Sequence, residues 1–294
     1  MGHEHTHHEK SLKNIRFAFF LNITFVIIEI IGGLLTNSLA ILSDALHDLG
    51  DSISLGLAWY FEKISNKKRT KEFTYGYKRF SLLAALVNSL ILIGGSFYIL
   101  SIAIPRLLSP ESINANGMLM LSLLGVTVNG IAALRVKRGK TLNEKVISWH
   151  LIEDVLGWIA VFIASTAMLI WDIPVLDPIL SILITTYILF NVIKYFKKTA
   201  MIFLQGVPDS LEIDKLEKII SKVPKVVGVH DTHVWSLDGD YNILTTHVVV
   251  KKNATIKDYL DVKCHVKDCF KKTSVHHVTV EVERENENCN LKKC

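Results

Sequence analysis

Residues 21–51, LNITFVIIEIIGGLLTNSLAILSDALHDLGD, decide how this chain folds. Two long apolar runs flank the short segment GLLTNS, a pattern typical of two successive membrane-spanning helices. The second run nevertheless carries Asp44, His47, Asp48 and Asp51. An ionisable side chain at the centre of a span costs at least about 2.5 kcal/mol, so these four residues are expected to serve a function.

The apolar residues of the chain are concentrated in its first two thirds. Half of the 294 residues are hydrophobic, and the mean hydropathy is +0.33. A spanning helix needs roughly 20 apolar residues. The windows that meet this requirement are 15–36, 38–60, 80–102, 116–135, 147–171 and 178–196.

After the linker FLQGVPDS, the chain has the composition of a soluble domain. Its periodicity predicts a helix over 210–223 that Ser210 caps, strands over 226–237 and 242–251, a helix over 255–272 and a last strand over 276–284. The sequence therefore predicts an α-helical membrane protein with six transmembrane helices and a C-terminal cytoplasmic α+β domain of order αββαβ. The predicted boundaries are a His-rich tail at 1–12, the membrane domain at 13–200 and the cytoplasmic domain at 201–294.

The basic residues predict the orientation of the spans. Lys and Arg cluster in the loops that follow the second and fourth spans, whereas the alternate loops contain only Arg106. Because basic loops stay in the cytoplasm, both termini are predicted to be cytoplasmic, in a multi-pass protein of the cell membrane.

The net charge of +5 arises from these loops, which argues against nucleic-acid binding. In the reducing cytosol the four cysteines favour a metal role over disulfides.

The ionisable residues of the second and fifth spans share one helix face in each span. Positions i, i+3, i+4 and i+7 lie on one face, which groups the four residues of the second span and, in the fifth, His150, Glu153 and Asp154. Both spans contain His-x-x-x-Asp, and two such pairs supply two nitrogens and two oxygens, a set that suits Zn²⁺. Spacing alone leaves alternatives open: a harder cation held by Asp44 and Asp48, a proton relay, or a polar network that braces the bundle.

At the level of whole motifs, the chain resembles the cation diffusion facilitator family, zinc-transporter type. The resemblance rests on SLAILSDALHDLGD, on YGYKRFSLLAALVN, on HLIEDVLGW, and on LQGVP, VHDTHVWSL, HVVV and HHVTVEVE in the tail. It implies a homodimeric secondary transporter, not an enzyme, that exports Zn²⁺ in exchange for protons by alternating access. The transport site that it implies is His47, Asp51, His150 and Asp154, with Asp44 and Asp48 as neighbours.

The same resemblance implies a cytoplasmic zinc site that modulates transport. Its ligands would be His230, His247, His276 and Glu283, together with Cys289 and Cys294, whose spacing is wider than the family's Cys-x-x-Cys. His276 and His277 point to opposite faces of a strand, and we favour His276 because its register matches Glu283. The N-terminal stretch GHEHTHHEK is either an expression tag or, as we favour, a loose tail that captures metal.

Two other classes of protein compete with the transporter. A membrane metalloenzyme would need a motif such as His-Glu-x-x-His, which the sequence lacks. A metal sensor would have a similar tail, but it would not need a paired His-x-x-x-Asp site inside the bilayer. The expected partners are therefore zinc ions, protons, the lipid bilayer and a second copy of the chain.

Overall fold

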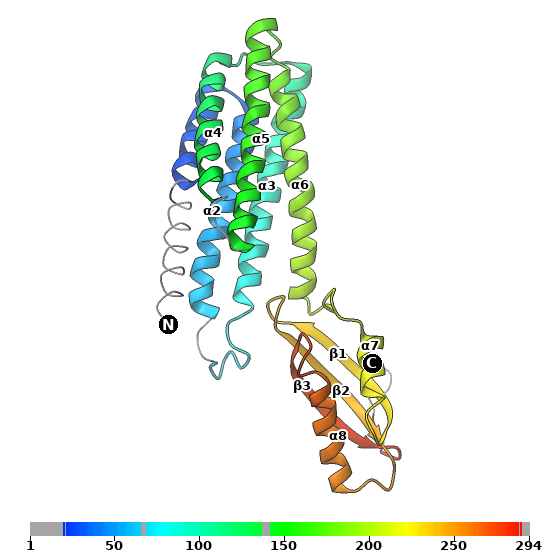
Figure 1. Cartoon of the computed structure of the whole chain (residues 1–294). Helices are drawn as coiled ribbons and strands as arrows, with labels where there is room; N and C mark the ends of the chain where they lie inside the picture. The colour runs from blue at the N-terminus through cyan, green and yellow to red at the C-terminus, as the bar shows by residue number, and fades with distance from the viewer. Residues whose placement is uncertain (1–19, 21, 66–68, 137–141, 288, 290–294) are drawn as a thin grey trace, which may run out of the picture. The chain divides into compact units, whose positions relative to one another are not determined.

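The computed structural model describes residues 20, 22–65, 69–136, 142–287 and 289. A helix at Asn22–Thr36 comes first. The long helices that follow run alongside one another in Figure 1: α2 (Leu39–Ser65), α3 (Phe80–Leu108), α4 (Ala115–Val136), α5 (Leu142–Trp171) and α6 (Leu176–Phe203). Together with the helix at Asn22–Thr36, these five helices correspond to the six predicted spans. Helices α3 and α6 continue for about one or two turns beyond the predicted ends.

The helices of the bundle match the dimensions of a bilayer. Within the described residues, α3, 115–134, 152–171 and α6 are long and apolar enough to cross a membrane. Helix α2 is equally long, but its acidic residues lower its hydropathy. Many large apolar side chains on these helices are exposed, among them Leu90, Phe97, Phe162, Leu183 and Phe190. A surface of this kind is expected where lipid surrounds the helices.

Buried polar contacts fix the start of α2 against α6. The carboxylate of Asp177 accepts hydrogen bonds from the Ser38 hydroxyl at 2.5 Å and from the Leu39 backbone N–H at 2.8 Å. It thereby caps the N-terminus of α2, where backbone N–H groups have no partner within the helix. Further along, the hydroxyl groups of Ser43 and Ser181 lie 2.7 Å apart and form a buried hydrogen bond. These contacts hold the face of α2 that carries the ionisable residues in a fixed rotation.

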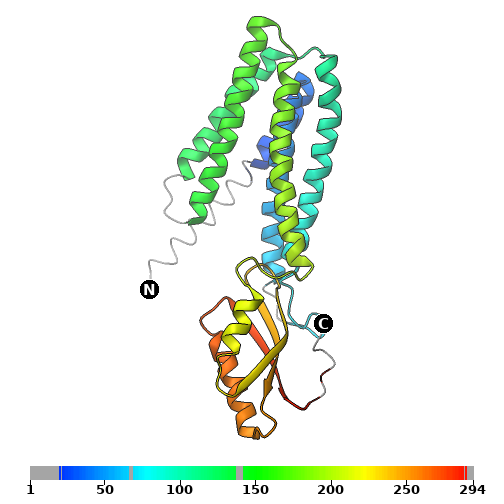
Figure 2. The same cartoon turned by 90° about the vertical axis from the view of Figure 1, so that its right-hand side faces the viewer.

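The C-terminal part has the predicted order αββαβ, seen from the side in Figure 2. Its elements are α7 (Ile213–Ile220), β1 (Val226–Ser236), β2 (Asn242–Val250), α8 (Ile256–Cys269) and β3 (Val275–Arg284). The sheet order is β1-β2-β3, with β1 antiparallel and β3 parallel to the central strand. The core between the sheet and the helices is made by buried side chains such as Leu216, Ile220, Leu244, Val248, Val262, Val266 and Phe270.

The sequence-based account of the first helix in this part was wrong at both ends: the helix predicted over 210–223 runs over Ile213–Ile220. Helix α7 begins at Ile213, and its N-cap is Glu212, whose side chain makes no capping hydrogen bond to a backbone N–H of the helix. Ser210 therefore does not cap it, because the chain first makes a turn in which the backbone N–H of Leu211 donates to the carbonyl of Pro208 at 2.9 Å. The turn displaces the helix start by three residues.

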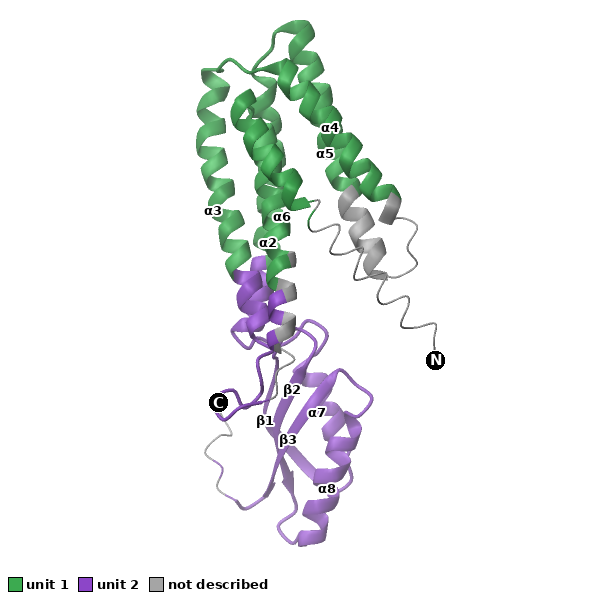
Figure 3. Ribbon diagram, turned by 90° about the vertical axis from the view of Figure 1, so that its left-hand side faces the viewer, with its two compact units in different colours: residues 1–59, 87–195 green, residues 60–86, 196–294 purple. Residues whose placement is uncertain are grey.

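The contacts divide the chain into two compact units (Figure 3). Unit 1 comprises residues 1–59 and 87–195 and contains most of the helical bundle. Unit 2 comprises 60–86 and 196–294, so it joins the sheet domain to the ends of α2, α3 and α6 and to the segment between α2 and α3. The predicted boundary at residue 200 stays a prediction.

Candidate metal sites

The first group of potential ligands lies on one face of α2. Ligand atoms of His47, Asp48 and Asp51 all lie within 4.8 Å of one another, and Nε2 of His47 is 3.6 Å from a carboxylate oxygen of Asp51. The helix itself creates this arrangement, because residues three and four positions apart are neighbours on its surface. Asp48 is 2% exposed and lies inside the bundle, whereas the side chains of His47 and Asp51 are 30% and 27% exposed.

The ionisable face of α2 is directed at α5. Asp44 lies beside Gly157, because a Cβ atom placed on that glycine would be 3.7 Å from Oδ1 of Asp44. Asp154, one turn before Gly157, is buried. Glu153, the residue before Asp154, is exposed and accepts a hydrogen bond from Tyr187 at 3.3 Å. The structure thus separates Asp154, which faces α2, from Glu153, which does not.

His150 and Asn22 need separate statements. The backbone of His150 belongs to α5, but its side chain lies outside the described residues, as do His3, His5, His7, His8 and Cys294 altogether. Asn22, in contrast, is described: its amide donates to the Ser52 hydroxyl at 3.0 Å and to the Asp48 carbonyl at 3.3 Å. Asn22 therefore links the first helix to α2 beside the ligand group, a role that its spacing in the sequence did not reveal.

The second group of potential ligands lies on the sheet of unit 2. His230, His247, Glu283 and Cys289 offer ligand atoms that all lie within 4.8 Å of one another. Antiparallel pairing places His230 directly opposite His247, with their ring centroids 5.3 Å apart. Glu283, two residues beyond the parallel partner of His247, lies 2.5 Å from its Nδ1. The three strands therefore bring these side chains to one place.

The donor set of this second group suits zinc. Two imidazoles, a carboxylate and a thiol sulfur are the ligands of tetrahedral zinc sites. Nε2 of His230 is buried and has no hydrogen-bond partner within the described residues, although a carboxylate oxygen of Glu283 lies 3.5 Å away. A buried imidazole nitrogen of this kind is available for a metal ion, so the residues fit the ion that the sequence predicts.

The charge state of Glu283 also favours a cation. Burial raises the pKa of this carboxyl, but hydrogen bonds from His247 and Cys289 and the charges of His230 and His247 outweigh burial. The pKa of Glu283 is therefore below its ordinary value. The ionised form that a metal needs is present at neutral pH.

A β-bulge shapes the strand next to this group. The register between β1 and β2 shifts between His230 and His233, and Asp231 has a φ of 48°, in the left-handed region. The bulge turns the Asp231 carboxylate toward His233, with a contact of 2.9 Å, and toward Nε2 of His247 at 3.5 Å. Backbone strain of this kind is concentrated at functional sites.

His276, Cys264 and Cys269 are not members of the second group. The ring of His276 stacks on Tyr241, with centroids 5.0 Å apart, and Lys78 approaches that same tyrosine at 4.5 Å. His277 instead meets Tyr75 edge-on. Cys264 and Cys269 are exposed on or at the end of α8. His276 therefore stays a predicted ligand that this conformation does not bring to His230, His247 and Glu283.

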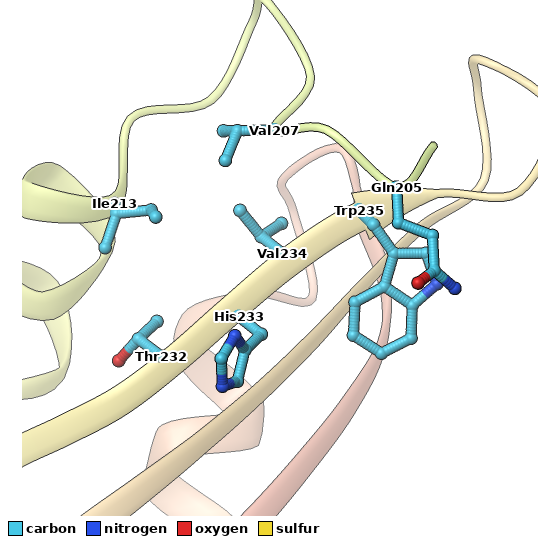
Figure 4. A pocket seen from close by; sticks show the side chains of 7 residues that line it. All are labelled: Gln205, Val207, Ile213, Thr232, His233, Val234 and Trp235. Atoms are coloured by element: carbon cyan, nitrogen blue, oxygen red, sulfur yellow. The ribbon is translucent and has the colours of Figure 1, made fainter. Parts of the chain in front are cut away.

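A cavity of about 280 Å³ lies beside β1 in unit 2 (Figure 4). Its lining combines the start of the C-terminal part with one edge of the sheet: Gln205, Val207, Ile213, Thr232, His233, Val234 and Trp235. His233 is the one lining residue among these with a metal-binding side chain, and the lining shares no residue with either ligand group. The cavity is consequently not the candidate metal site.

Comparisons with known proteins cover nearly the whole chain. Residues 15–204 match the cation efflux transmembrane domain, and residues 208–285 match the cytoplasmic domain of cation efflux proteins. A cadmium, cobalt and zinc/H⁺-K⁺ antiporter of Bacillus velezensis is 34% identical over 96% of this chain and 92% of its own length. The metal cation efflux system protein CzcD of Cupriavidus metallidurans is 33% identical, over 96% and 90%. The zinc transporter ZitB of Escherichia coli is 29% identical, over 96% and 93%.

Proposed function

The chain belongs to the cation diffusion facilitator family of cation efflux transporters, zinc-transporter type, and from this premise we propose that it exports Zn²⁺ from the cytosol in exchange for protons. It is an integral multi-pass membrane protein and a metal-cation transporter, not an enzyme. The proposed transport ligands are His47 and Asp51 of α2 with His150 and Asp154 of α5. The similarity to relatives named for zinc supports the choice of ion.

One observation carries the proposal: the ionisable faces of α2 and α5 are turned toward each other. Asp44 lies against Gly157, and Asp154 is buried on that same side of α5. The sequence contains no Lys or Arg within 38–60 or 147–171, so the membrane-spanning stretches that carry these carboxylates contribute no Lys or Arg charge. A divalent cation between α2 and α5 would add positive charge beside them.

Exchange with protons follows from the chemistry of these ligands. Histidine and carboxylate bind zinc only when they are deprotonated, so zinc and protons compete for the same atoms. In an alternating-access cycle, zinc binds from the cytosol, the helices rearrange, and protons displace it on the other side. The absence of thiolates from the proposed ligand set favours release, because soft sulfur ligands would hold zinc more tightly.

The cytoplasmic domain is proposed to dimerise and to bind zinc through His230, His247, Glu283 and Cys289. The match of residues 208–285 to the family's cytoplasmic domain supports dimerisation, and the grouping of the four potential ligands supports zinc binding. A metal that binds one conformation of this domain better than another would shift the transporter toward that conformation. The basic loops support an orientation with both termini in the cytoplasm.

Transport is tested by zinc entry into liposomes that contain the purified protein. An acidic lumen provides the proton gradient, and a zinc-sensitive dye in the lumen reports entry. The wild type should load zinc, and Asp154→Ala should abolish loading because it removes a buried ligand. Glu153→Ala is the matched control, since that acid is adjacent in sequence but exposed.

Two results would overturn the proposal. Absence of gradient-driven zinc entry in the wild type would favour a metal sensor over a transporter. Equal entry in wild type and Asp154→Ala would remove α5 from the transport site. Repeating the assay with Cd²⁺, Co²⁺ and Mn²⁺ measures the selectivity, for which relatives named for cadmium and cobalt give the first candidates.

A further inference from the structure

His247, in the second group of potential ligands, has acidic neighbours at both of its ring nitrogens. Nδ1 lies 2.5 Å from Oε1 of Glu283 and 3.8 Å from the sulfur of Cys289, so this nitrogen faces the other potential ligands. The other ring nitrogen, Nε2, lies 3.5 Å from Oδ2 of Asp231 and 3.6 Å from a carboxylate oxygen of Glu281. The ring is therefore placed to bind a metal through Nδ1 and to be oriented through Nε2.

The β-bulge in β1 is what brings Asp231 to His247. His230 pairs directly with His247, and in a regular strand the next residue, Asp231, would point to the opposite face of the sheet. After His230 the register shifts, so that Asp231 and Thr232 together stand opposite the single residue Thr246. The hydroxyl groups of Thr232 and Thr246 form a buried hydrogen bond of 3.0 Å. The carboxylate of Asp231 consequently stays on the side of the sheet that carries His247.

Asp231 is the more firmly held of the two carboxylates near Nε2 of His247. Its side chain is 10% exposed, whereas that of Glu281 is 67% exposed. The other oxygen of Asp231, Oδ1, forms a hydrogen bond of 2.9 Å with Nε2 of His233. A shielded carboxylate with contacts at both oxygens can hold an imidazole in one orientation, whereas an exposed ion pair contributes little.

We propose that Asp231 is the positioning residue of the cytoplasmic zinc site, accepting a hydrogen bond from Nε2–H of His247 so that Nδ1 is presented to the metal. A histidine that binds a metal through one ring nitrogen commonly donates its other N–H to a carboxylate, which fixes the tautomer and the direction of the ring. Asp231 itself does not touch the metal in this arrangement. The inference rests on the zinc binding proposed for this domain and adds a residue that sets its strength.

The backbone of Asp231 allows its two roles to be separated. Its φ of 48° lies in the left-handed region, which glycine adopts freely and asparagine more readily than most residues. If only the bulge matters, Asp231→Gly should bind zinc as tightly as the parent protein. If the carboxylate orients His247, Asp231→Gly should bind zinc about 10- to 100-fold more weakly. Asp231→Asn should recover part of this loss, because its amide oxygen still accepts a hydrogen bond but is a weaker acceptor than a carboxylate.

The test is zinc affinity, measured by competition with a chelator on the full-length protein in detergent. The parent protein and every variant carry Asp154→Ala, which removes a proposed ligand of the membrane site, so that binding at the cytoplasmic group dominates. Glu281→Gln is the matched control, because it removes the charge of the exposed carboxylate near Nε2, and it should bind zinc as the parent does. If Asp231→Gly does not fold, Asp231→Asn decides, and an affinity equal to that of the parent overturns the inference.

The outcomes separate this inference from the proposed zinc binding. A parent protein whose zinc affinity does not fall on His247→Ala would contradict the cytoplasmic site itself and, with it, the role of Asp231. A parent that loses affinity on His247→Ala but keeps it on Asp231→Gly would contradict only the role of Asp231. Equal losses in Asp231→Gly and Glu281→Gln would also contradict that role, because negative charge near the ring, and not its orientation, would then set the affinity.

Discussion

Asp44 of α2 lies against Gly157 of α5, so close that a methyl group on the glycine would be 3.7 Å from the carboxylate. Helical periodicity predicts that the ionisable residues of each span share a face. It does not predict that the faces of two different spans meet. The contact between these two residues therefore connects the two halves of the proposed zinc site.

The size of residue 157 should control transport. Gly157→Ala adds a methyl group at an ordinary van der Waals distance from Asp44, so the variant should fold and transport zinc. Gly157→Leu fills the space between the two helices and should reduce zinc flux about tenfold or more, since a small misplacement of binding groups is costly. Flux in liposomes, normalised to the amount of folded protein, measures both. Equal flux in the Leu variant and the wild type would mean that this contact is not part of the ion path.

Gly125 of α4 should be intolerant of any side chain. A Cβ atom there would overlap the indole ring of Trp158, which is fully buried in α5. Gly125→Ala should therefore destabilise the bundle by about 1 to 3 kcal/mol through overpacking. Thermal unfolding in detergent measures this loss. Gly130→Ala is the matched control in the same helix, because nothing lies within 4 Å of that position, and its thermal stability should not fall.

Asp258 should make the cytoplasmic domain sensitive to acid. The Lys225 ammonium and hydrogen bonds from Thr255, at the N-cap of α8, hold the pKa of Asp258 well below its ordinary value. A carboxyl group whose pKa is lower in the folded protein than in the unfolded protein stabilises the fold at any pH above its unfolded-state pKa of about 3.9. This stabilisation is lost as the pH falls from that value through the pKa of the folded state. The urea concentration that unfolds half of residues 201–294 should therefore decrease as the pH is lowered below about 4. In the Asp258→Asn variant this decrease should be smaller. Fluorescence of Trp235, the tryptophan of this segment, reports unfolding. Identical pH profiles for both proteins would contradict the assignment.

The sulfur of Cys289 should contribute to zinc binding in the cytoplasmic domain. It lies 3.8 Å from Nδ1 of His247, within the group that also contains His230 and Glu283. Cys289→Ala should weaken zinc binding to residues 201–294, whereas Cys264→Ala should not, because Cys264 is exposed on α8. Competition with a chelator measures the affinity, and cobalt substitution tests for a sulfur-to-metal absorption band. A cobalt complex without that band would exclude Cys289 as a ligand.

Much of the fold was predictable because it depends on local properties of the sequence. Six apolar windows and the alternation of strands follow from composition and period, and the αββαβ order was confirmed. The start of α7 was predicted wrongly, since a turn closed by Pro208 and Leu211 intervenes and no periodicity indicates it.

The candidate sites were predictable only in part. Spacing in the sequence determines whether two ligand residues of one helix are neighbours, but it does not determine which residues of different elements meet. The spacing of His47 and Asp51 is sufficient to place them together. The meeting of His230 and His247 depends on strand register, and the approach of Cys289 depends on the path of the chain after β3. The position of His276 also depends on strand register, because it lies five residues before Glu281, the parallel partner of His247.

The central claim is that α2 and α5 hold the same zinc ion, and a double-mutant cycle on zinc affinity tests it most directly. Asp51→Asn, Asp154→Asn and the double variant would be compared by calorimetry in full-length protein that also carries His247→Ala, which weakens binding at the cytoplasmic group. If both aspartates bind one ion, the two losses should be non-additive, with a coupling energy of about 0.5 to 3 kcal/mol. Two losses that simply add would show that Asp51 and Asp154 act on different ions, and would contradict the shared site.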